Sequence, residues 1–310
     1  MRAITQKSFG GPEVLELTEA PRPVPGPTEV LVRVQAVGIN PVEAVIRAGA
    51  FALIGQPPFT LGWDVSGVVA EVDPGVNRFQ VGDEVYGMPY FPRAADGYAE
   101  YVAAPSRQLV RKPAGLSHVE AAALPLAGLT AWQMLVDIAA VGEGQRVLIH
   151  GAGGGVGHLA VQIAKARGAY VIATASAAKH PFLRELGADE TVDYRATDFA
   201  AVVRDVDAVI ETVGGDTGRR SVATLRHGGI LVTAVDKADA ELARAAETAG
   251  VRFAGISVEP DVVGLESLNA LVETGQLRPY VEQTFDLADA AKAHGVIEGG
   301  HVRGKVVLTV

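Results

Sequence analysis

The chain has 310 residues, of which 48% are hydrophobic, so it can bury a large core and is long enough for two domains. Its formal net charge of −9 argues against nucleic acid or an anionic membrane as a partner. The absence of cysteine excludes disulfides, thiolate metal sites and cysteine nucleophiles, and it suits a reducing, cytoplasmic compartment.

The start of the chain, MRAITQKSFG, has no apolar segment of the signal-peptide type and is expected to form the first strand. The longest apolar region, residues 119–141, is interrupted by Pro125, Gln133 and Asp137. A core helix is therefore favoured over a membrane span. We expect neither a membrane nor a nucleic acid as a partner.

Residues 3–112 show short β-like segments separated by glycine and proline. Alternating apolar and polar residues predict strands at 30–37 and 65–72, and one short helix is expected at 44–49. Segments of this density favour a small, partly open β-barrel over a parallel sheet.

A helical region follows. Ser117 and Glu120 form a capping-box pattern at the start of a first helix. Pro125 interrupts it, and a second helix is expected from Gly128 to Ile138.

Residues 146–175, RVLIHGAGGGVGHLAVQIAKARGAYVIATA, predict a strand, a glycine-rich turn, a helix and a second strand. The turn fits the dinucleotide-binding fingerprint, with alanine in the place of the first glycine. Glycines let a diphosphate approach the backbone, and the helix N-terminus offers unpaired N–H groups and partial positive charge. We predict a cofactor site made of Ala152, Gly154, Gly155, Val156 and Gly157. A methyltransferase or a plain tight turn can carry a similar pattern.

The end of the second strand indicates which dinucleotide is bound. NAD sites usually hold the ribose 2′-hydroxyl with an acidic residue about 20 positions past the first glycine. No acidic residue occurs between Gly157 and Glu185, where the chain has Ser176 and Lys179 instead. A hydroxyl and an ammonium attract a 2′-phosphate that a carboxylate would repel, so NADPH is the expected cofactor. The alternative for Lys179 is a solvated lysine at a helix start.

Alternation of strands and helices continues to about residue 258 and predicts a doubly wound, Rossmann-type α/β domain. In this fold the cofactor contacts residues that follow the carboxyl ends of strands. The candidates at such positions are Thr212, Val213, Gly214, Val235 and Ser257.

β-like character returns after Leu277, with a strand in PYVEQTF, a helix from Asp286 to Ile297 and a final strand in GKVVLTV. The C-terminal segment is expected to rejoin the first domain. We therefore predict one domain from residues 1–118 and 275–310 and a second from residues 119–274, with the ligand in the cleft between them.

Eight motifs occur in order along the chain: AVGINPVEAVIRAG, LGWDVSGVV, VGDEVYG, DGYAEYV, LPLAGLTAWQ, AGGGVG, ETVGG and HVRGKVVL. With these motifs the chain resembles the zinc-free quinone oxidoreductase branch of the medium-chain dehydrogenase/reductase family. The resemblance implies a GroES-like catalytic domain beside the Rossmann domain. It also implies a homodimer joined through an edge strand near residues 254–258.

The resemblance further implies that no catalytic zinc is bound. Zinc-dependent members place metal ligands where this chain has Asn40, Trp63 and Ala127, and these three cannot form a zinc site together. Without a Lewis acid, alcohol oxidation at neutral pH is slow, whereas an electrophilic acceptor needs less help. The expected substrates are small-molecule quinones and activated alkenes.

Roles for single residues also follow from the resemblance. It places Asn40 and Thr130 beside the nicotinamide, Tyr194 near the 2′-phosphate and Lys305 at the diphosphate. From the residues alone, Asn40 is also compatible with a turn and Thr130 with a plain hydroxyl at a helix start. Tyr194 is also compatible with a half-buried strand end and Lys305 with a solvated sheet edge.

The roles of two further acidic residues stay open, and one histidine is interpreted as structural. Glu43 and Asp64 stand at positions that are commonly acidic in the family, and they are as compatible with structural acceptors as with catalysts. His150 is interpreted as a packed strand-end residue, and the seven histidines show no metal-ligand spacing.

The predicted reaction is hydride transfer from NADPH to a quinone or to the β-carbon of an α,β-unsaturated carbonyl, driven by proximity and orientation. Asn40 is expected to hydrogen-bond the developing oxyanion, with water supplying the proton. Two alternatives stay open: an enoyl or ene reductase acting on a biosynthetic C=C bond, and a non-catalytic NADPH-binding redox sensor.

Overall fold

A computed structural model describes residues 1–51 and 53–310. Within it the chain forms two compact units. The first, which we call the β unit, comprises Met1–Leu129, Glu259–Glu273 and Pro279–Val310. The second, the α/β unit, comprises Thr130–Val258 and Thr274–Arg278.

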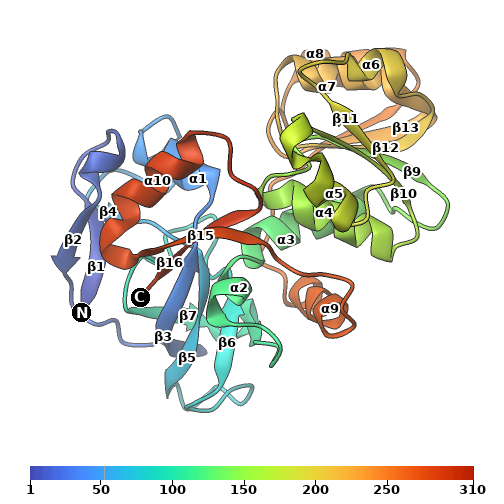
Figure 1. Ribbon diagram of the computed structural model, residues 1–310. Helices are drawn as coiled ribbons and strands as arrows, with labels where there is room; N and C mark the ends of the chain where they lie inside the picture. Colours follow the sequence, from blue (N-terminus) through green and yellow to red (C-terminus); the bar gives the residue numbers. More distant parts are fainter. Residues whose placement is uncertain (52) are drawn as a thin grey trace. The chain divides into compact units, whose positions relative to one another are not determined.

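The β unit contains a seven-stranded sheet in the order β15-β16-β3-β5-β6-β8, with β7 also paired to β3, and a three-stranded sheet in the order β2-β1-β4 (Figure 1). The strands are β1 (Arg2–Gln6), β2 (Glu16–Glu19), β3 (Glu29–Gly38), β4 (Phe59–Thr60), β5 (Asp64–Val72), β6 (Glu84–Gly87), β7 (Tyr101–Pro105), β8 (Leu109–Arg111), β15 (Val281–Asp286) and β16 (Lys305–Thr309). The helices are α1 (Pro41–Arg47), α2 (His118–Ala122), α9 (Val262–Glu273) and α10 (Ala290–Glu298).

Strand β3 organises this unit because it pairs with β5, β7 and β16. Val30, Val32 and Val34 alternate along it and are buried together with Leu31, Ala36 and Val37, as expected for a strand at the centre of a core. β16 runs antiparallel to β3 with Val307 opposite Gly38, so the C-terminal segment lies in a sheet whose other strands include residues 29–111.

The α/β unit has a six-stranded parallel sheet in the order β11-β10-β9-β12-β13-β14, which is the strand order of a doubly wound fold. The strands are β9 (Arg146–Ile149), β10 (Tyr170–Ala175), β11 (Glu190–Asp193), β12 (Val206–Glu211), β13 (Leu225–Thr233) and β14 (Arg252–Gly255). The helices are α4 (Gly155–Ala166), α5 (His180–Glu185), α6 (Phe199–Val202), α7 (Asp216–Ser221) and α8 (Ala240–Thr248). Figure 1 shows α4 and α5 on one side of this sheet and α6, α7 and α8 on the other.

Apolar strand residues and helix residues form the core of the α/β unit. Leu148, Ile172 and Leu231 of the sheet pack in one cluster with Leu242 and Ala246 of α8. The predicted α/β fold class, with a β-rich first domain and a doubly wound second one, is confirmed.

Two helices begin earlier than the sequence pattern predicted. The helix expected at 44–49 starts at Pro41, and the one expected from Gly128 starts at Pro125. In both cases the proline takes the first helical position, where its missing N–H costs no hydrogen bond. Consequently α3 (Pro125–Trp132) carries Thr130 in its second turn, and a π-helical segment, Gln133–Ile138, continues it.

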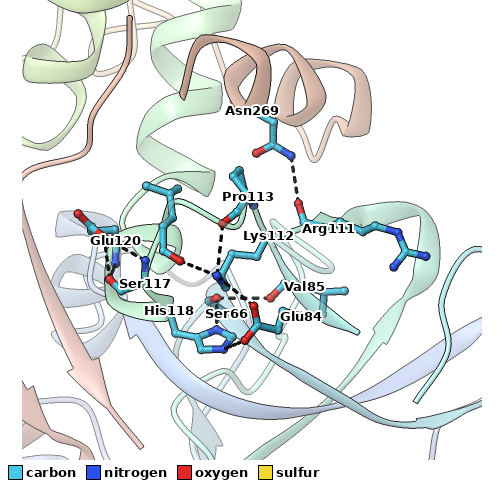
Figure 2. A network of polar contacts seen from close by, with 11 residues as sticks. Ser66, Glu84, Val85, Arg111, Lys112, Pro113, Ser117, His118, Glu120 and Asn269 are labelled. Atoms are coloured by element: carbon cyan, nitrogen blue, oxygen red, sulfur yellow. Dashed lines mark hydrogen bonds and ion pairs between the residues drawn. The ribbon is translucent and has the colours of Figure 1, made fainter. Parts of the chain in front are cut away.

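Helix α9 is anchored to the β unit by polar side chains. The Tyr86 hydroxyl donates to Asn269 Oδ1 at 2.6 Å, and Asn269 Nδ2 donates to the Arg111 carbonyl at 3.1 Å, as Figure 2 shows for the second bond. Arg78 and Glu266 form an ion pair at 3.6 Å. These contacts group residues 259–273 with the β unit, which differs from the predicted range 119–274 for the second domain.

The segment between β8 and α2 is held by the polar network in Figure 2. Lys112 Nζ donates to the Leu116 carbonyl at 2.5 Å and pairs with Glu84 at 3.1 Å. His118 lies 3.4 Å from Glu84 through Nε2 and 2.8 Å from Ser66 Oγ through Nδ1. The chain leading into α2 is thereby fixed on β5 and β6.

The capping box predicted at the start of α2 is confirmed, since the Ser117 hydroxyl accepts from the Glu120 N–H and the Glu120 carboxylate accepts from the Ser117 N–H. Over residues 1–51 and 53–310, no helix has both the length and the apolar composition that crossing a bilayer requires.

Candidate functional site

The glycine turn between β9 and α4 has the geometry of a phosphate-binding loop. Gly154 is the N-cap of α4, so the N–H groups of Gly155, Val156 and Gly157 belong to the first turn, where backbone donors have no intrahelical acceptor. A Cβ on Gly157 would lie 2.4 Å from the Gly151 carbonyl oxygen, so only glycine fits there. The turn presents donors and the positive end of the α4 dipole to an anion.

The predicted cofactor residues of this turn are brought together by the fold. Ala152 is buried and its N–H donates to the Thr174 carbonyl at 3.2 Å, which ties the turn to the end of β10. Gly151 has a φ of +60°, a conformation that favours glycine and reverses the chain after β9.

The carboxyl ends of β10 and β11 carry two cations. Ser176 follows β10 and precedes a short 3-10 turn that ends at Lys179. The Lys179 side chain crosses the glycine turn, since its Cδ lies 2.6 Å from the place a Cβ on Gly153 would take. Tyr194 and Arg195 follow β11. Because Ala175 at the end of β10 lies opposite Asp193 at the end of β11, Ser176 and Lys179 leave the sheet at the same carboxyl edge as Tyr194 and Arg195.

Arg195 is a residue that the sequence analysis missed. Its guanidinium lies 5.7 Å from the ring centroid of Tyr194, which is half exposed. The backbone N–H of Arg195 donates to Asp193 Oδ1 at 3.0 Å, which fixes the turn after β11. The signal was present in the sequence, as a basic residue directly after the predicted tyrosine.

Glu211 is a second residue that was missed, and it orders the turn after β12. It is fully buried, and its Oε1 accepts the N–H groups of Val213 at 2.6 Å and Gly214 at 2.7 Å. Its Oε2 accepts the Thr233 hydroxyl at 2.9 Å, which links the ends of β12 and β13. Thr212 donates through Oγ1 to the His150 carbonyl at 3.1 Å.

The remaining predicted positions of the α/β unit lie at the same edge of the sheet. Val235 is half exposed after β13, and its N–H donates to Thr233 Oγ1 at 3.2 Å. Ser257, which follows β14, is exposed and accepts a 2.6 Å hydrogen bond from Lys237 Nζ. Val213 is half exposed as well. Whether these residues contact a cofactor stays a prediction.

His150 has the contacts of a packed structural residue. Its Nε2 lies 2.8 Å from Ser221 Oγ, whose proton goes to the Thr217 carbonyl, so Nε2 is the donor. Its Nδ1 then accepts from the Thr174 hydroxyl at 2.9 Å. Burial first, and the Arg220 charge second, lower the pKa of His150 to about 3, so the ring is neutral.

In the β unit, Asn40 lies where β3 ends and is the N-cap of α1. Lys305 Nζ donates to its Oδ1 at 2.5 Å, and its Nδ2 donates to Asp64 Oδ2 at 2.9 Å. An ammonium is only a donor and a carboxylate is an acceptor, so the amide cannot be flipped. One N–H of the Asn40 amide is therefore not used by these two bonds.

Asp64 and Lys305 hold this amide from two strands, β5 and β16. Lys305 is buried, and it also donates to the Ile39 carbonyl at 2.9 Å and lies 3.3 Å from Asp64 Oδ2. Asp64 Oδ1 accepts the Leu126 N–H at 2.8 Å. Burial raises the pKa of Asp64, and the Lys305 charge opposes the rise.

These contacts settle two of the open interpretations. Asn40 bonds to neighbouring side chains through its amide and is not a simple turn residue, and Lys305 is not a solvated edge lysine. A contact of Lys305 with the diphosphate stays a prediction, as does a contact of the buried Thr130 with the nicotinamide.

Glu43 lies in the first turn of α1 and is fully buried. Its Oε2 accepts the Asn40 N–H at 2.8 Å and the Tyr98 hydroxyl at 2.7 Å. Burial is the largest cause that raises the pKa of Glu43 to about 7, and the Asp64 charge adds to it. Glu43 is thus a structural acceptor at the helix start whose protonation changes near neutral pH.

Known proteins resemble this chain over its full length. Residues 26–114 match the family model of the alcohol dehydrogenase GroES-like domain, and residues 186–308 match a model described as zinc-binding dehydrogenase. Human quinone oxidoreductase is 31% identical over 323 residues, covering 99% of this chain and 97% of the human protein.

Two solved structures show the same likeness. The quinone oxidoreductase from Coxiella burnetii is 39% identical with a TM-score of 0.95, covering 100% of this chain and 99% of the other. The mycobacterial protein Rv1454c, solved in complex with NADPH, is 30% identical with a TM-score of 0.89 and full coverage of both chains.

Zinc, which one of these descriptions names, does not fit the residues present. The Trp63 indole N–H donates to the Arg93 carbonyl at 2.7 Å, Ala127 has no ligating atom, and the Asn40 oxygen already faces an ammonium. In the described part of the chain, no three His, Cys, Asp or Glu side chains gather as a metal site.

Proposed function

Because the chain belongs to the medium-chain dehydrogenase/reductase family and groups with its quinone oxidoreductases, we propose that it is an NADPH-dependent, metal-independent oxidoreductase that transfers hydride to quinones or activated alkenes. The observation that carries the proposal is the fixed orientation of the Asn40 amide, which leaves one N–H for an acceptor oxygen.

The α/β unit supplies the cofactor site. The glycine turn receives the diphosphate, and Lys179 and Arg195 supply the positive charge that a 2′-phosphate requires. No carboxylate stands at the end of β10 to bind a 2′-hydroxyl. The half-exposed Tyr194, beside Arg195, supports the same choice of NADPH.

The β unit supplies the group that receives the acceptor. When bound, the reduced cofactor provides a hydride from its nicotinamide. As the hydride adds, negative charge develops on the acceptor oxygen, and the Asn40 N–H stabilises it from a position that Lys305 and Asp64 have already fixed. Such an acceptor needs no Lewis acid, which agrees with the absence of a zinc ligand set at Asn40, Trp63 and Ala127.

We expect the cofactor preference to depend on Lys179 and Arg195. Changing both to glutamate should lower the ratio of kcat/KM for NADPH over NADH by about a hundredfold, because charge-assisted bonds to the phosphate become repulsive. Steady-state kinetics with both cofactors measure this. Arg204→Glu is the matched control, since Arg204 is an exposed arginine that precedes β12 at the amino end of the sheet. An unchanged ratio in the double variant would show that the 2′-phosphate binds elsewhere.

Acceptor kinetics test the reaction class. With NADPH present, we expect turnover of 1,4-benzoquinone, 9,10-phenanthrenequinone or simple enones. Faster turnover of enoyl thioesters than of any quinone would assign the protein as an enoyl reductase instead. Tight NADPH binding without turnover of any acceptor would reject the enzyme and favour a redox sensor.

We also propose a cytoplasmic homodimer. In the described part of the chain β14 pairs with β13 alone, so its other edge has unpaired N–H and C=O groups that a second copy can satisfy. Sedimentation velocity should give twice the mass of the 310-residue chain. A monomer in the unaltered protein would reject this interface.

A further inference from the structure

A chain of buried polar side chains runs from the surface of the β unit to Asn40. Glu298 Oε1 accepts from Arg47 Nη2 at 2.6 Å, and Arg47 Nη1 lies 3.0 Å from His294 Nδ1. His294 Nε2 lies 3.0 Å from the Tyr98 hydroxyl, which lies 2.7 Å from Glu43 Oε2. Arg47, His294, Tyr98 and Glu43 are all buried, whereas the Glu298 carboxylate is 41% exposed.

Each hydrogen bond in the series from Arg47 to Glu43 has a fixed donor and a fixed acceptor. A guanidinium always donates, so His294 Nδ1 must accept from Arg47. The neutral ring then donates from Nε2 to the Tyr98 oxygen, and the Tyr98 proton must go to Glu43. Burial, with a smaller effect of Arg47, lowers the pKa of His294 to about 3, which keeps the ring in this form.

Glu43 has one oxygen that takes no part in these bonds. Its Oε2 accepts both the Asn40 N–H and the Tyr98 O–H, while its buried Oε1 has no hydrogen-bond partner. A proton can therefore bind at Oε1 without breaking either bond. The carboxyl group has the same neighbours in its charged and neutral forms.

The charges that face Glu43 come from four elements. Asp64 of β5 and Lys305 of β16 form an ion pair, and their charges act on the Glu43 pKa in opposite directions. Arg47 of α1 is paired with Glu298 of α10. Ionised Glu43 is thus the unbalanced negative charge beside Asn40, and it opposes the negative charge that develops on an acceptor oxygen.

We propose that Glu43 is a positioning residue that sets both the orientation and the local charge at Asn40, and that Tyr98, held by His294 and Arg47, acts on Asn40 through Glu43. The inference rests on the proposed function, because it concerns the same acceptor oxygen. Acceptor reduction is fast with neutral Glu43 and slow with ionised Glu43.

The sign of the pH effect follows. Since the pKa of Glu43 is raised to about 7, kcat at saturating NADPH should fall on the order of tenfold as the pH rises through this value. Tyr98→Phe removes a bond that favours the carboxylate, so the fall should move to higher pH by about one unit. Glu43→Gln cannot ionise and should keep its low-pH rate throughout.

The experiment measures kcat against pH for 9,10-phenanthrenequinone with the unaltered protein and both variants. Tyr90→Phe is the matched control, because Tyr90 also donates to a glutamate, Glu29, in the same unit but outside this chain of bonds. We expect the transition of Tyr90→Phe to stay at the pH of the unaltered protein. An unshifted transition in Tyr98→Phe, the loss of the transition in that variant, or a flat profile in the unaltered protein would overturn the inference.

Difference infrared spectroscopy gives a readout that does not need turnover. The C=O stretch of a buried carboxyl should appear as the pH falls through about 7, should be missing in Glu43→Gln and should move in Tyr98→Phe. If the protein turns over an acceptor but kcat does not change with pH and the C=O band is missing, this inference is rejected and the proposed function stands. The band without turnover of any acceptor rejects the proposed function and the effect on rate, while the link between Tyr98 and Glu43 stands.

Discussion

Replacing Asn40 by alanine should lower kcat by about a hundredfold with little change in NADPH affinity, because one fixed donor to the developing oxyanion is lost. The amide is held by Lys305 at 2.5 Å and by Asp64 at 2.9 Å, and alanine provides neither contact nor the N–H. Stopped-flow hydride transfer at saturating NADPH measures the effect on the chemical step.

Asn40→Asp separates the donor from the packing of the site. The aspartate keeps an oxygen for Lys305 and remains a good N-cap for α1, but it has no N–H for an acceptor and adds negative charge beside Asp64. We expect a loss of kcat at least as large as with alanine. Wild-type kcat in this variant would show that the Asn40 donor is not required.

Gly157→Ala should weaken NADPH binding by at least about tenfold, because a Cβ would lie 2.4 Å from the Gly151 carbonyl and 2.5 Å from Ala152 Cα. These atoms belong to the turn that receives the diphosphate, so relief of the clash must displace its N–H groups. Fluorescence titration with NADPH measures the dissociation constant.

Gly142→Ala is the matched control in the same unit, since a Cβ there would meet its nearest atom, Gln145 Oε1, only at 4.0 Å. We expect the control to bind NADPH like the unaltered protein. Equal affinity of all three proteins would mean that the turn does not form the diphosphate site.

Local sequence patterns predicted the fold well where neighbouring residues decide it. The strand, turn, helix and strand of residues 146–175 form within one segment, and β9, α4 and β10 follow the predicted ranges closely. Helix starts were less accurate because Pro125 was interpreted as an interruption and the helix expected at 44–49 was begun too late, whereas Pro41 and Pro125 each begin a helix. The grouping of α9 depends on Asn269 meeting Tyr86 and Arg111, which no local pattern reveals.

The same distinction applies to the site. The glycine turn and the Ser176–Lys179 segment follow from spacing, but the environment of Asn40 is built by Asp64 and Lys305, which are 24 and 265 positions away. The hydrogen-bonded series through Tyr98 and His294 joins residues 196 positions apart, and burial, with a contribution from the Asp64 charge, gives Glu43 its raised pKa. Such contacts follow from the tertiary structure and leave no periodic signal in the sequence.

The central claim is that this chain passes hydride from NADPH to an electron-poor acceptor without a metal. We would compare the oxidation of NADPH and of NADH, at equal concentrations, with 9,10-phenanthrenequinone in the presence and absence of EDTA. The account predicts turnover with NADPH that exceeds turnover with NADH and is unchanged by EDTA. Loss of activity on chelation, or a preference for NADH, would contradict it.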